Sequence, residues 1–180
     1  LRAAKPLLER FDVPATVFVT TGNLGQDREF WWDELERIFL EPGTLPRALS
    51  LRVWGATHEW NLGESYYYSK NAYRRYRRWT AEEQPPTARH LLHSTVWKLL
   101  QPLPEADRRQ ALDELLFWAG IGSESRPAYR SLSAQEVRDL SRGGLIEIGA
   151  HSVTHPVLCD LPSDMQYDEI QRSKVRLEEI

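Results

Sequence analysis

Apolar positions along the chain follow helical spacing in some segments and strand-like runs in others. Residues 3–11 carry a helical stripe of apolar side chains, with Pro6 suited to a first turn, and predict a helix that begins near Ala4. Residues 15–20 predict a strand that ends at Thr21-Gly22-Asn23. The side chains expected to be buried on both faces of this strand are Val17, Phe18 and Val19.

A second predicted helix is followed by a strand near the C-terminal end of the chain. Ser133 and Glu136 have the spacing of a capping box and predict a helix through Ser141. Gly143-Gly144 ends this helix before an apolar strand at residues 145–148. Helices that alternate with buried strands imply parallel strands with helical crossovers, so the predicted fold class is α/β.

A last helix is predicted from Ser163, where residues 163–166 have the pattern of a capping box. Its apolar face comprises Tyr167, Ile170, Leu177 and Ile180. No glycine, asparagine or proline closes this helix, and the helix at residues 3–11 begins almost at the first residue. We therefore expect the chain to be part of a longer domain.

The middle of the chain is too long for a plain connection between a strand and a helix. We expect three parts: residues 1–26 and 131–180 form one α/β domain, and residues 27–130 form an insertion with its own helical core. Within the insertion, apolar spacing predicts helices at residues 30–40, at 87–100 and from Pro104 to Gly120. Residues 49–54 and 59–62 could pair as a hairpin through Gly55–His58.

The amino-acid composition is typical of a globular protein. The chain has 180 residues, 41% of them hydrophobic and 27% charged, with a net charge of -3. This mild acidity gives no reason to expect nucleic acid as a partner, and no apolar run approaches the roughly 20 residues of a membrane span. Cys159 is the only cysteine, which excludes an internal disulfide and favours a reducing compartment such as the cytoplasm.

Candidate chemistry is concentrated in Gly149-Ala150-His151-Ser152-Val153-Thr154-His155-Pro156, which directly follows the predicted strand. Two imidazoles four residues apart can share a metal ion if the backbone makes a helical turn. An extended chain would hold the two Cβ atoms roughly 13 Å apart, whereas a turn brings them to about 6 Å. The hydroxyls of Ser152 and Thr154 could orient the rings or cap a local turn. Two ordinary surface histidines remain the alternative.

Residues 147–156 resemble the second motif of the polysaccharide deacetylases, a carbohydrate esterase family, and residues 8–22 are similar to its first helix and second strand. The resemblance implies a distorted seven-stranded (β/α) barrel in which His151 and His155 bind a divalent metal, and imidazole ligands favour zinc. The family's Thr-Phe-Asp-Asp-Gly motif, which carries the catalytic base and third metal ligand, is absent from this sequence. The family's later motifs, among them the general acid, would lie beyond Ile180.

The resemblance therefore implies part of an enzyme that removes acetyl groups from an acetylated polysaccharide or oligosaccharide, with these 180 residues inactive alone. Two alternatives stay open. One is another metal-dependent barrel hydrolase that cleaves amides or esters. The other is a non-catalytic module in which the insertion binds carbohydrate or protein. The oligomeric state is left unassigned.

Three further segments carry weaker signals. Trp31 and Trp32 could contact substrate at the barrel mouth, although core packing is the ordinary role of such rings. Residues 73–79 interleave arginines with aromatic rings, which favours an exposed helix face over a nucleic-acid surface. His90 and His93 lie three apart on a predicted helix, and we expect them to be packed or exposed histidines rather than metal ligands.

Overall fold

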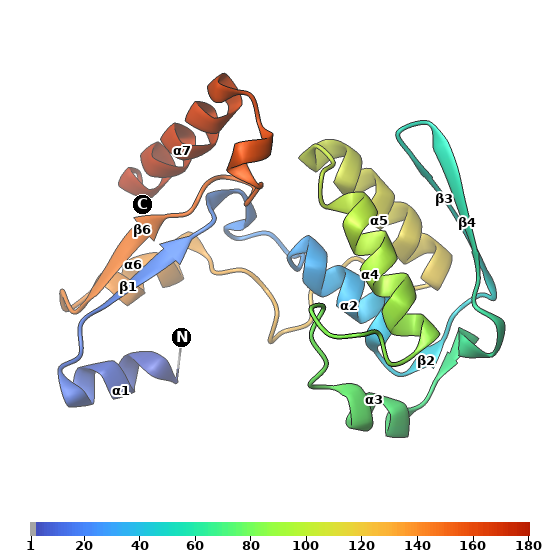
Figure 1. The fold of residues 1–180 in the computed structure, drawn as a ribbon. Helices are drawn as coiled ribbons and strands as arrows, with labels where there is room; N and C mark the ends of the chain where they lie inside the picture. Colours follow the sequence, from blue (N-terminus) through green and yellow to red (C-terminus); the bar gives the residue numbers. More distant parts are fainter. Residues whose placement is uncertain (1–2) are drawn as a thin grey trace. The chain divides into compact units, whose positions relative to one another are not determined.

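The computed structural model describes residues 3–180, and their contacts divide them into two compact units (Figure 1). Unit 1 combines the chain up to Arg28 with Arg130–Ile180, and unit 2 is Glu29–Tyr129. These boundaries lie within two residues of those expected for the insertion. Each unit has its own internal packing.

Unit 1 is built around two parallel strands. The strands β1 (Ala15–Val19) and β6 (Ile146–Ala150) pair along their whole length, with Ala15 opposite Ile146 and Val19 opposite Ala150. The helices of the unit are α1 (Ala4–Phe11), α6 (Ala134–Ser141) and α7 (Ser163–Glu178), with short 3-10 turns η1 (Thr21–Asn23) and η3 (Leu158–Asp160). The predicted parallel α/β pairing is confirmed.

The helix α6 is fixed at both ends. At its start, Ser133 Oγ accepts from the Glu136 N–H, and the Glu136 carboxylate accepts from the Ser133 N–H, which confirms the predicted capping box. At its C-terminal end, the ammonium of Lys5 on α1 donates to the carbonyls of Asp139, Leu140 and Arg142 at 2.7, 3.0 and 2.9 Å. A cation at the C-terminal carbonyls also complements the helix dipole.

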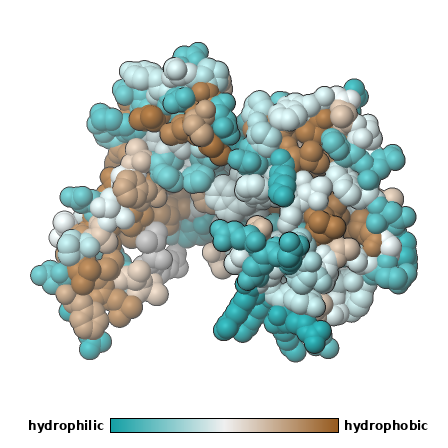
Figure 2. Space-filling view, viewed as in Figure 1, coloured by the Kyte–Doolittle hydropathy of each residue, from teal (hydrophilic) through white to brown (hydrophobic). Residues whose placement is uncertain are grey.

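The predictions for the burial of Phe18 and for the start of α7 are wrong. Phe18 is 64% exposed rather than buried, because side chains alternate along a strand and Phe18 lies on the face opposite to Val17 and Val19. Ser163 forms no capping box, since the preceding Pro162 occupies the N-cap position and Ser163 is already the first helical residue. Figure 2 shows the resulting apolar surface around α1 and β1, to which Leu7, Phe11 and Phe18 contribute.

Unit 2 is mainly helical, as expected. Its helices are α2 (Trp31–Leu40), α3 (Lys70–Tyr76), α4 (Ala88–Leu100) and α5 (Glu105–Ala119), with the 3-10 turn η2 (Gly63–Tyr66). Its strands form two antiparallel pairs: β2 (Gly43–Thr44) with β5 (Tyr67–Tyr68), and β3 (Ala48–Val53) with β4 (Ala56–Asn61). The expected termini of α4 and α5 are confirmed: Thr87 caps α4 through its side chain, and Gly120 ends α5 in the left-handed region.

The core of unit 2 lies where α2, α4, α5 and β3 meet. The strand β3 alternates strictly, with Leu49, Leu51 and Val53 buried and the residues between them exposed. The helices contribute fully buried side chains to the same cluster, among them Leu35, Phe39, Val96, Leu100, Leu112 and Leu115.

The hairpin β3–β4 is confirmed, but its turn differs from the expected one. The chain reverses at Trp54-Gly55, both with positive φ (50° and 78°), and Ala56 already pairs with Val53. A two-residue turn with two left-handed residues matches the twist of the strands. The expected four-residue turn at Gly55–His58 is therefore wrong by its position and length.

The two ends of unit 2 are joined by a buried carboxylate. Glu29 is fully buried and accepts from the Arg126 backbone N–H at 2.7 Å and from its guanidinium at 2.7 Å. Arg126 also binds Glu41, and Arg37 approaches Glu29 at 3.4 Å. These bonds lower the pKa of Glu29 although burial opposes them.

No helix within residues 3–180 has the length and apolar character of a membrane span.

Candidate metal site

The candidate site begins where the two parallel strands of unit 1 end. The chain leaves β1 at Val19 and β6 at Ala150, and the pairing continues one step further, because the His151 N–H donates to the Val19 carbonyl at 3.0 Å. The Thr20 hydroxyl donates to the His151 carbonyl at 3.2 Å. Both loops therefore start from the carboxyl ends of neighbouring parallel strands, which is where α/β sheets and barrels bind ligands.

The loop after β6 is held against the loop after β1. The N–H groups of Thr21 and Gly22 donate to the carbonyls of Ser152 and Val153 at 3.1 and 2.8 Å. Gly22 is required for this approach, since a Cβ built there would lie 2.5 Å from the Val153 carbonyl oxygen. The loop that carries the histidines is thus fixed by the backbone of the neighbouring strand.

The imidazoles of His151 and His155 lie together. Their ring centroids are 4.7 Å apart, and the ring planes meet at 72°. Zinc binds imidazole nitrogen at about 2.1 Å, so two rings on one tetrahedral ion have centroids about 5 Å apart. The observed spacing is close to that value, and both residues are exposed, so a cation can reach them.

The backbone between the two histidines is not the helical turn that was predicted. Ser152 and His155 both have positive φ, 57° and 58°, and no residue from 151 to 155 is helical. The Ser152 hydroxyl accepts from the His155 N–H at 3.1 Å and donates to the His151 carbonyl at 2.6 Å. A side-chain-capped loop thus brings the rings together where a helical turn was expected, because Ser152 competes for the local backbone groups.

Glu169 on α7 anchors this loop, and sequence reasoning missed it. Its carboxylate accepts from the N–H groups of Val153 and Thr154 at 2.7 and 2.9 Å, and from the Thr154 hydroxyl at 2.9 Å. Glu169 lies 14 residues after His155 on a helix face without a motif, so only the fold reveals this role. The hydroxyls of Ser152 and Thr154, for which ring orientation and local capping were both open, hold the loop.

One aromatic ring borders the histidine pair. Phe18 packs against Gly149, where a Cβ would lie 2.6 Å from the ring, and the Phe18 centroid lies 6.3 Å from that of His151. This close approach of the Phe18 ring requires the missing Cβ of Gly149. Exposed Phe18 gives the histidine pair an apolar neighbour on the β1 side.

The donor set near the histidines is incomplete for a metal. Within residues 3–180, no group of three or more histidine, cysteine, aspartate or glutamate side chains converges in a metal-binding arrangement. Glu169, the carboxylate that binds this loop, is occupied by loop donors. Two imidazoles supply suitable nitrogen ligands for zinc, but a structural or catalytic zinc site needs at least one more protein ligand.

The tryptophans expected near the barrel mouth belong to unit 2. Trp31 is 7% exposed and packs in the core, with its ring 5.6 Å from that of Trp97. Trp32 is partly buried, stacks on Phe30 at 4.7 Å between centroids, and lines a cavity within unit 2. Of the two, Trp32 is the one that faces a space where a ligand could lie.

Comparison with known proteins adds no assignment, since the chain matches no protein-family model, no curated protein and no solved structure.

Proposed function

We propose that this chain is part of a metal-dependent carbohydrate deacetylase, in which His151 and His155 supply two protein ligands to zinc. The observation that carries this proposal is the 4.7 Å separation of the two imidazole rings at the end of a parallel strand pair. The local motif and the resemblance of residues 8–22 to the same family point in the same direction.

The wider barrel is part of the proposal. Sheets of parallel strands are ordinarily covered on both faces, whereas Phe18 on β1 is 64% exposed. Such a strand pair fits two neighbouring strands of a larger barrel. In that setting the loops after β1 and β6 would face the mouth of the barrel, together with the histidine pair.

The chain's own residues would hold and orient the metal. The imidazoles bind it, and Glu169 and Ser152 fix the loop that presents them. Two imidazoles and one carboxylate leave a coordination position open, and zinc so bound lowers the pKa of a water ligand and polarises an acetyl carbonyl. The resemblance assigns the carboxylate ligand and the base to a motif outside these 180 residues, so we expect no turnover from them alone.

Zinc titration tests the histidine pair directly. We expect NMR signals of the His151 and His155 imidazoles to shift with Zn²⁺ at pH 7.5, with weak, micromolar or poorer affinity. The variants His151→Ala and His155→Ala should each weaken binding at least tenfold, while His58→Ala on the β3–β4 hairpin should leave it unchanged. Equal affinity in all four proteins would refute the shared site.

Acetate release from N-acetylglucosamine oligomers tests whether catalysis needs the base and the carboxylate ligand that the resemblance assigns to a motif outside these 180 residues. The 180-residue chain with zinc should release no acetate above the level of zinc in buffer. A longer form of the protein that carries the Asp-Asp pair should release it, and should lose that activity in His151→Ala. Turnover by the 180 residues would contradict the assignment of the base to the missing motif.

A further inference from the structure

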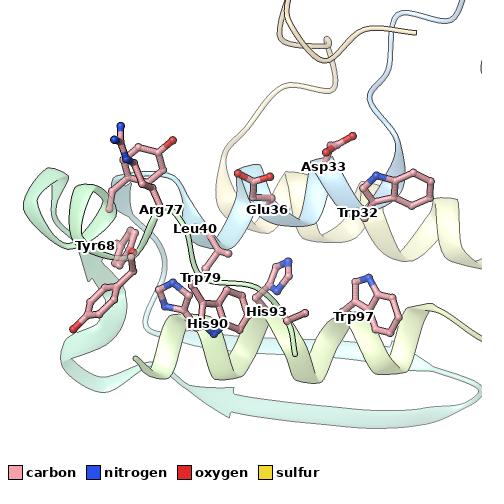
Figure 3. Close-up of a pocket in the computed structure, with 13 residues that line it drawn as sticks. Trp32, Asp33, Glu36, Leu40, Tyr68, Arg77, Trp79, His90, His93 and Trp97 are labelled. Atoms are coloured by element: carbon pink, nitrogen blue, oxygen red, sulfur yellow. The ribbon is translucent and has the colours of Figure 1, made fainter. Parts of the chain in front are cut away.

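Unit 2 encloses a cavity of about 280 Å³ that the proposed metal site does not use (Figure 3). Its walls come from α2, β5, α3, α4 and the segment between α3 and α4. All of its lining residues belong to unit 2, so the cavity is complete within one compact unit. The volume is near the lower end of the range for small-molecule sites.

Aromatic rings form most of the walls. The indoles that line the cavity are Trp32, Trp79 and Trp97, and the phenols are Tyr68, Tyr73 and Tyr76. In Figure 3, Trp32 on α2 and Trp97 on α4 lie at one end of the cavity. The segment 73–79 was expected to be an exposed helix face. Its arginines are exposed, but its rings are half-buried and turn toward this cavity.

Two carboxylates on α2 line the same space. Asp33 and Glu36 are half-buried, and within residues 3–180 neither side chain has a hydrogen-bond or ion-pair partner. Burial is the main cause that raises the pKa of both, that of Asp33 to about 6. The neighbouring Glu29 adds negative charge, and Arg126, whose guanidinium binds Glu29 and Glu41, offsets part of it.

Burial favours the neutral form of both histidines of the cavity, and one of them has an unused nitrogen. Burial lowers the pKa of His90, and it lowers that of His93 to about 4. Thr87 Oγ1 lies 2.7 Å from His90 Nδ1, whereas His93 Nδ1 is buried without a partner among the described residues. His93 is 8% exposed, and Figure 3 shows its ring rising from α4 toward α2, which carries Asp33 and Glu36.

These features favour a ligand of positive charge with apolar substituents. Aromatic faces carry partial negative charge and attract cations, most strongly indole faces. The unpaired carboxylates would repel an anion. A bare metal ion is not favoured, since no cluster of three metal-ligating side chains occurs within residues 3–180. The one arginine of the lining, Arg77, is exposed and lies at the end of the cavity opposite Trp32 and Trp97 (Figure 3).

We propose that this cavity binds a small organic cation, an alkylated or quaternary ammonium group held among the indole rings beside Asp33 and Glu36. A neutral imidazole at His93 can accept a hydrogen bond from such a ligand if it carries an N–H or O–H group. The proposal goes beyond the deacetylase function and does not depend on it, because the two sites lie in different units.

The test uses choline as the probe and its uncharged carbon isostere, 3,3-dimethylbutan-1-ol, as the control ligand. The indole N–H signals of the full chain are followed by NMR during titration. Trp79 Nε1 is buried without a partner in the described structure, so its signal should shift with choline, along with those of Trp32 and Trp97. The Trp118 indole, which donates to the Ala48 carbonyl at 2.7 Å, should not shift. We expect choline to bind at least tenfold more tightly than the isostere.

A double substitution, Asp33→Asn with Glu36→Gln, tests the role of charge. It keeps side-chain shape and removes two half-buried charges, so the protein should stay folded, and choline affinity should fall at least tenfold. Glu59→Gln is the matched control, since Glu59 is an exposed carboxylate on β4 outside the cavity. The proposal fails if choline causes no shifts up to 100 mM, if the isostere binds equally well, or if the double variant keeps its affinity.

Discussion

Single residues in the cavity of unit 2 make its stability sensitive to pH. His93 has an ordinary pKa of 6.5, and burial lowers it to about 4, with a smaller contribution from the charge of His90. The unfolded chain therefore takes up this proton as the pH falls through 6.5, while the folded chain resists until about pH 4. Protons bound preferentially by the unfolded state destabilise the fold, so stability should fall across that window.

The substitution His93→Gln should remove this contribution, because an amide does not titrate in this range. Between pH 7.0 and 4.5, the free energy of unfolding of the natural chain should fall by about 2 kcal/mol more than that of the variant. Urea unfolding at both pH values measures the difference. The half-buried carboxylates of Asp33 and Glu36 are present in both proteins, and His58→Gln on the hairpin provides the control. Parallel losses in all three proteins would contradict this account of His93.

The histidine pair shows how far residue patterns alone can lead. The spacing of His151 and His155 predicted that the rings could meet, and they do, at 4.7 Å between centroids. The predicted helical turn between them was wrong, because the Ser152 hydroxyl accepts from the His155 N–H and both residues have positive φ. Spacing limits the reach of a chain, but competition for backbone hydrogen bonds decides its local conformation.

At the scale of elements, the anchor between α7 and the histidine loop can be tested by Glu169→Gln. The amide keeps the size of the carboxylate but loses its charge and one of its two acceptor oxygens, so it cannot accept from all three loop donors as strongly as the carboxylate does. We expect the free energy of unfolding to fall by about 1–2 kcal/mol. The N–H groups of Val153 and Thr154 should exchange faster with solvent, as measured by NMR.

The same variant bears on the proposed zinc site. Residues that orient metal ligands commonly change affinity by about 10–100-fold, so zinc binding should weaken by about tenfold. Asp168→Asn is the matched control, since Asp168 is the exposed neighbour of Glu169 on the same helix. Unchanged exchange at both loop amides would show that Glu169 does not hold the loop. Faster exchange with unchanged zinc affinity would show that Glu169 holds the loop but does not affect zinc binding.

Elements with local signals were predictable, and contacts between distant elements were not. The capping box of α6, the Thr87 cap of α4 and the glycine at the end of α5 are all encoded within a few residues. Arg89 has no such signal. It is 1% exposed, and its guanidinium donates to carbonyls of Phe39, Gly43, Ser65 and Tyr66. Only the assembled fold distinguishes this arginine from the exposed ones of residues 74–78.

Across the whole molecule, the two units differ in how much apolar surface they bury. The buried hydrophobic residues of the described part of unit 1 are Val19, Val137, Leu140 and Ile146. Unit 2 has a continuous cluster from α2, α4, α5 and β3, and the Glu29–Arg126 bonds join its two ends. Burial of apolar surface is the main favourable contribution to folding, so unit 2 should be the more stable of the two.

We therefore expect the chain to unfold in two steps, with unit 1 first. Amide hydrogen exchange in low urea should give β1 and β6 smaller opening free energies than α4 and α5.

The segment Glu29–Tyr129, expressed alone, should keep a dispersed NMR spectrum and a cooperative unfolding transition, because its core and the bonds between its ends lie within it. Arg126→Gln, which leaves the buried Glu29 carboxylate only the longer contact with Arg37 at 3.4 Å, should lower the stability of that segment by about 3 kcal/mol. One unfolding transition shared by β1, β6, α4 and α5 would contradict the independence of the two units. An unfolded Glu29–Tyr129 segment would contradict it as well.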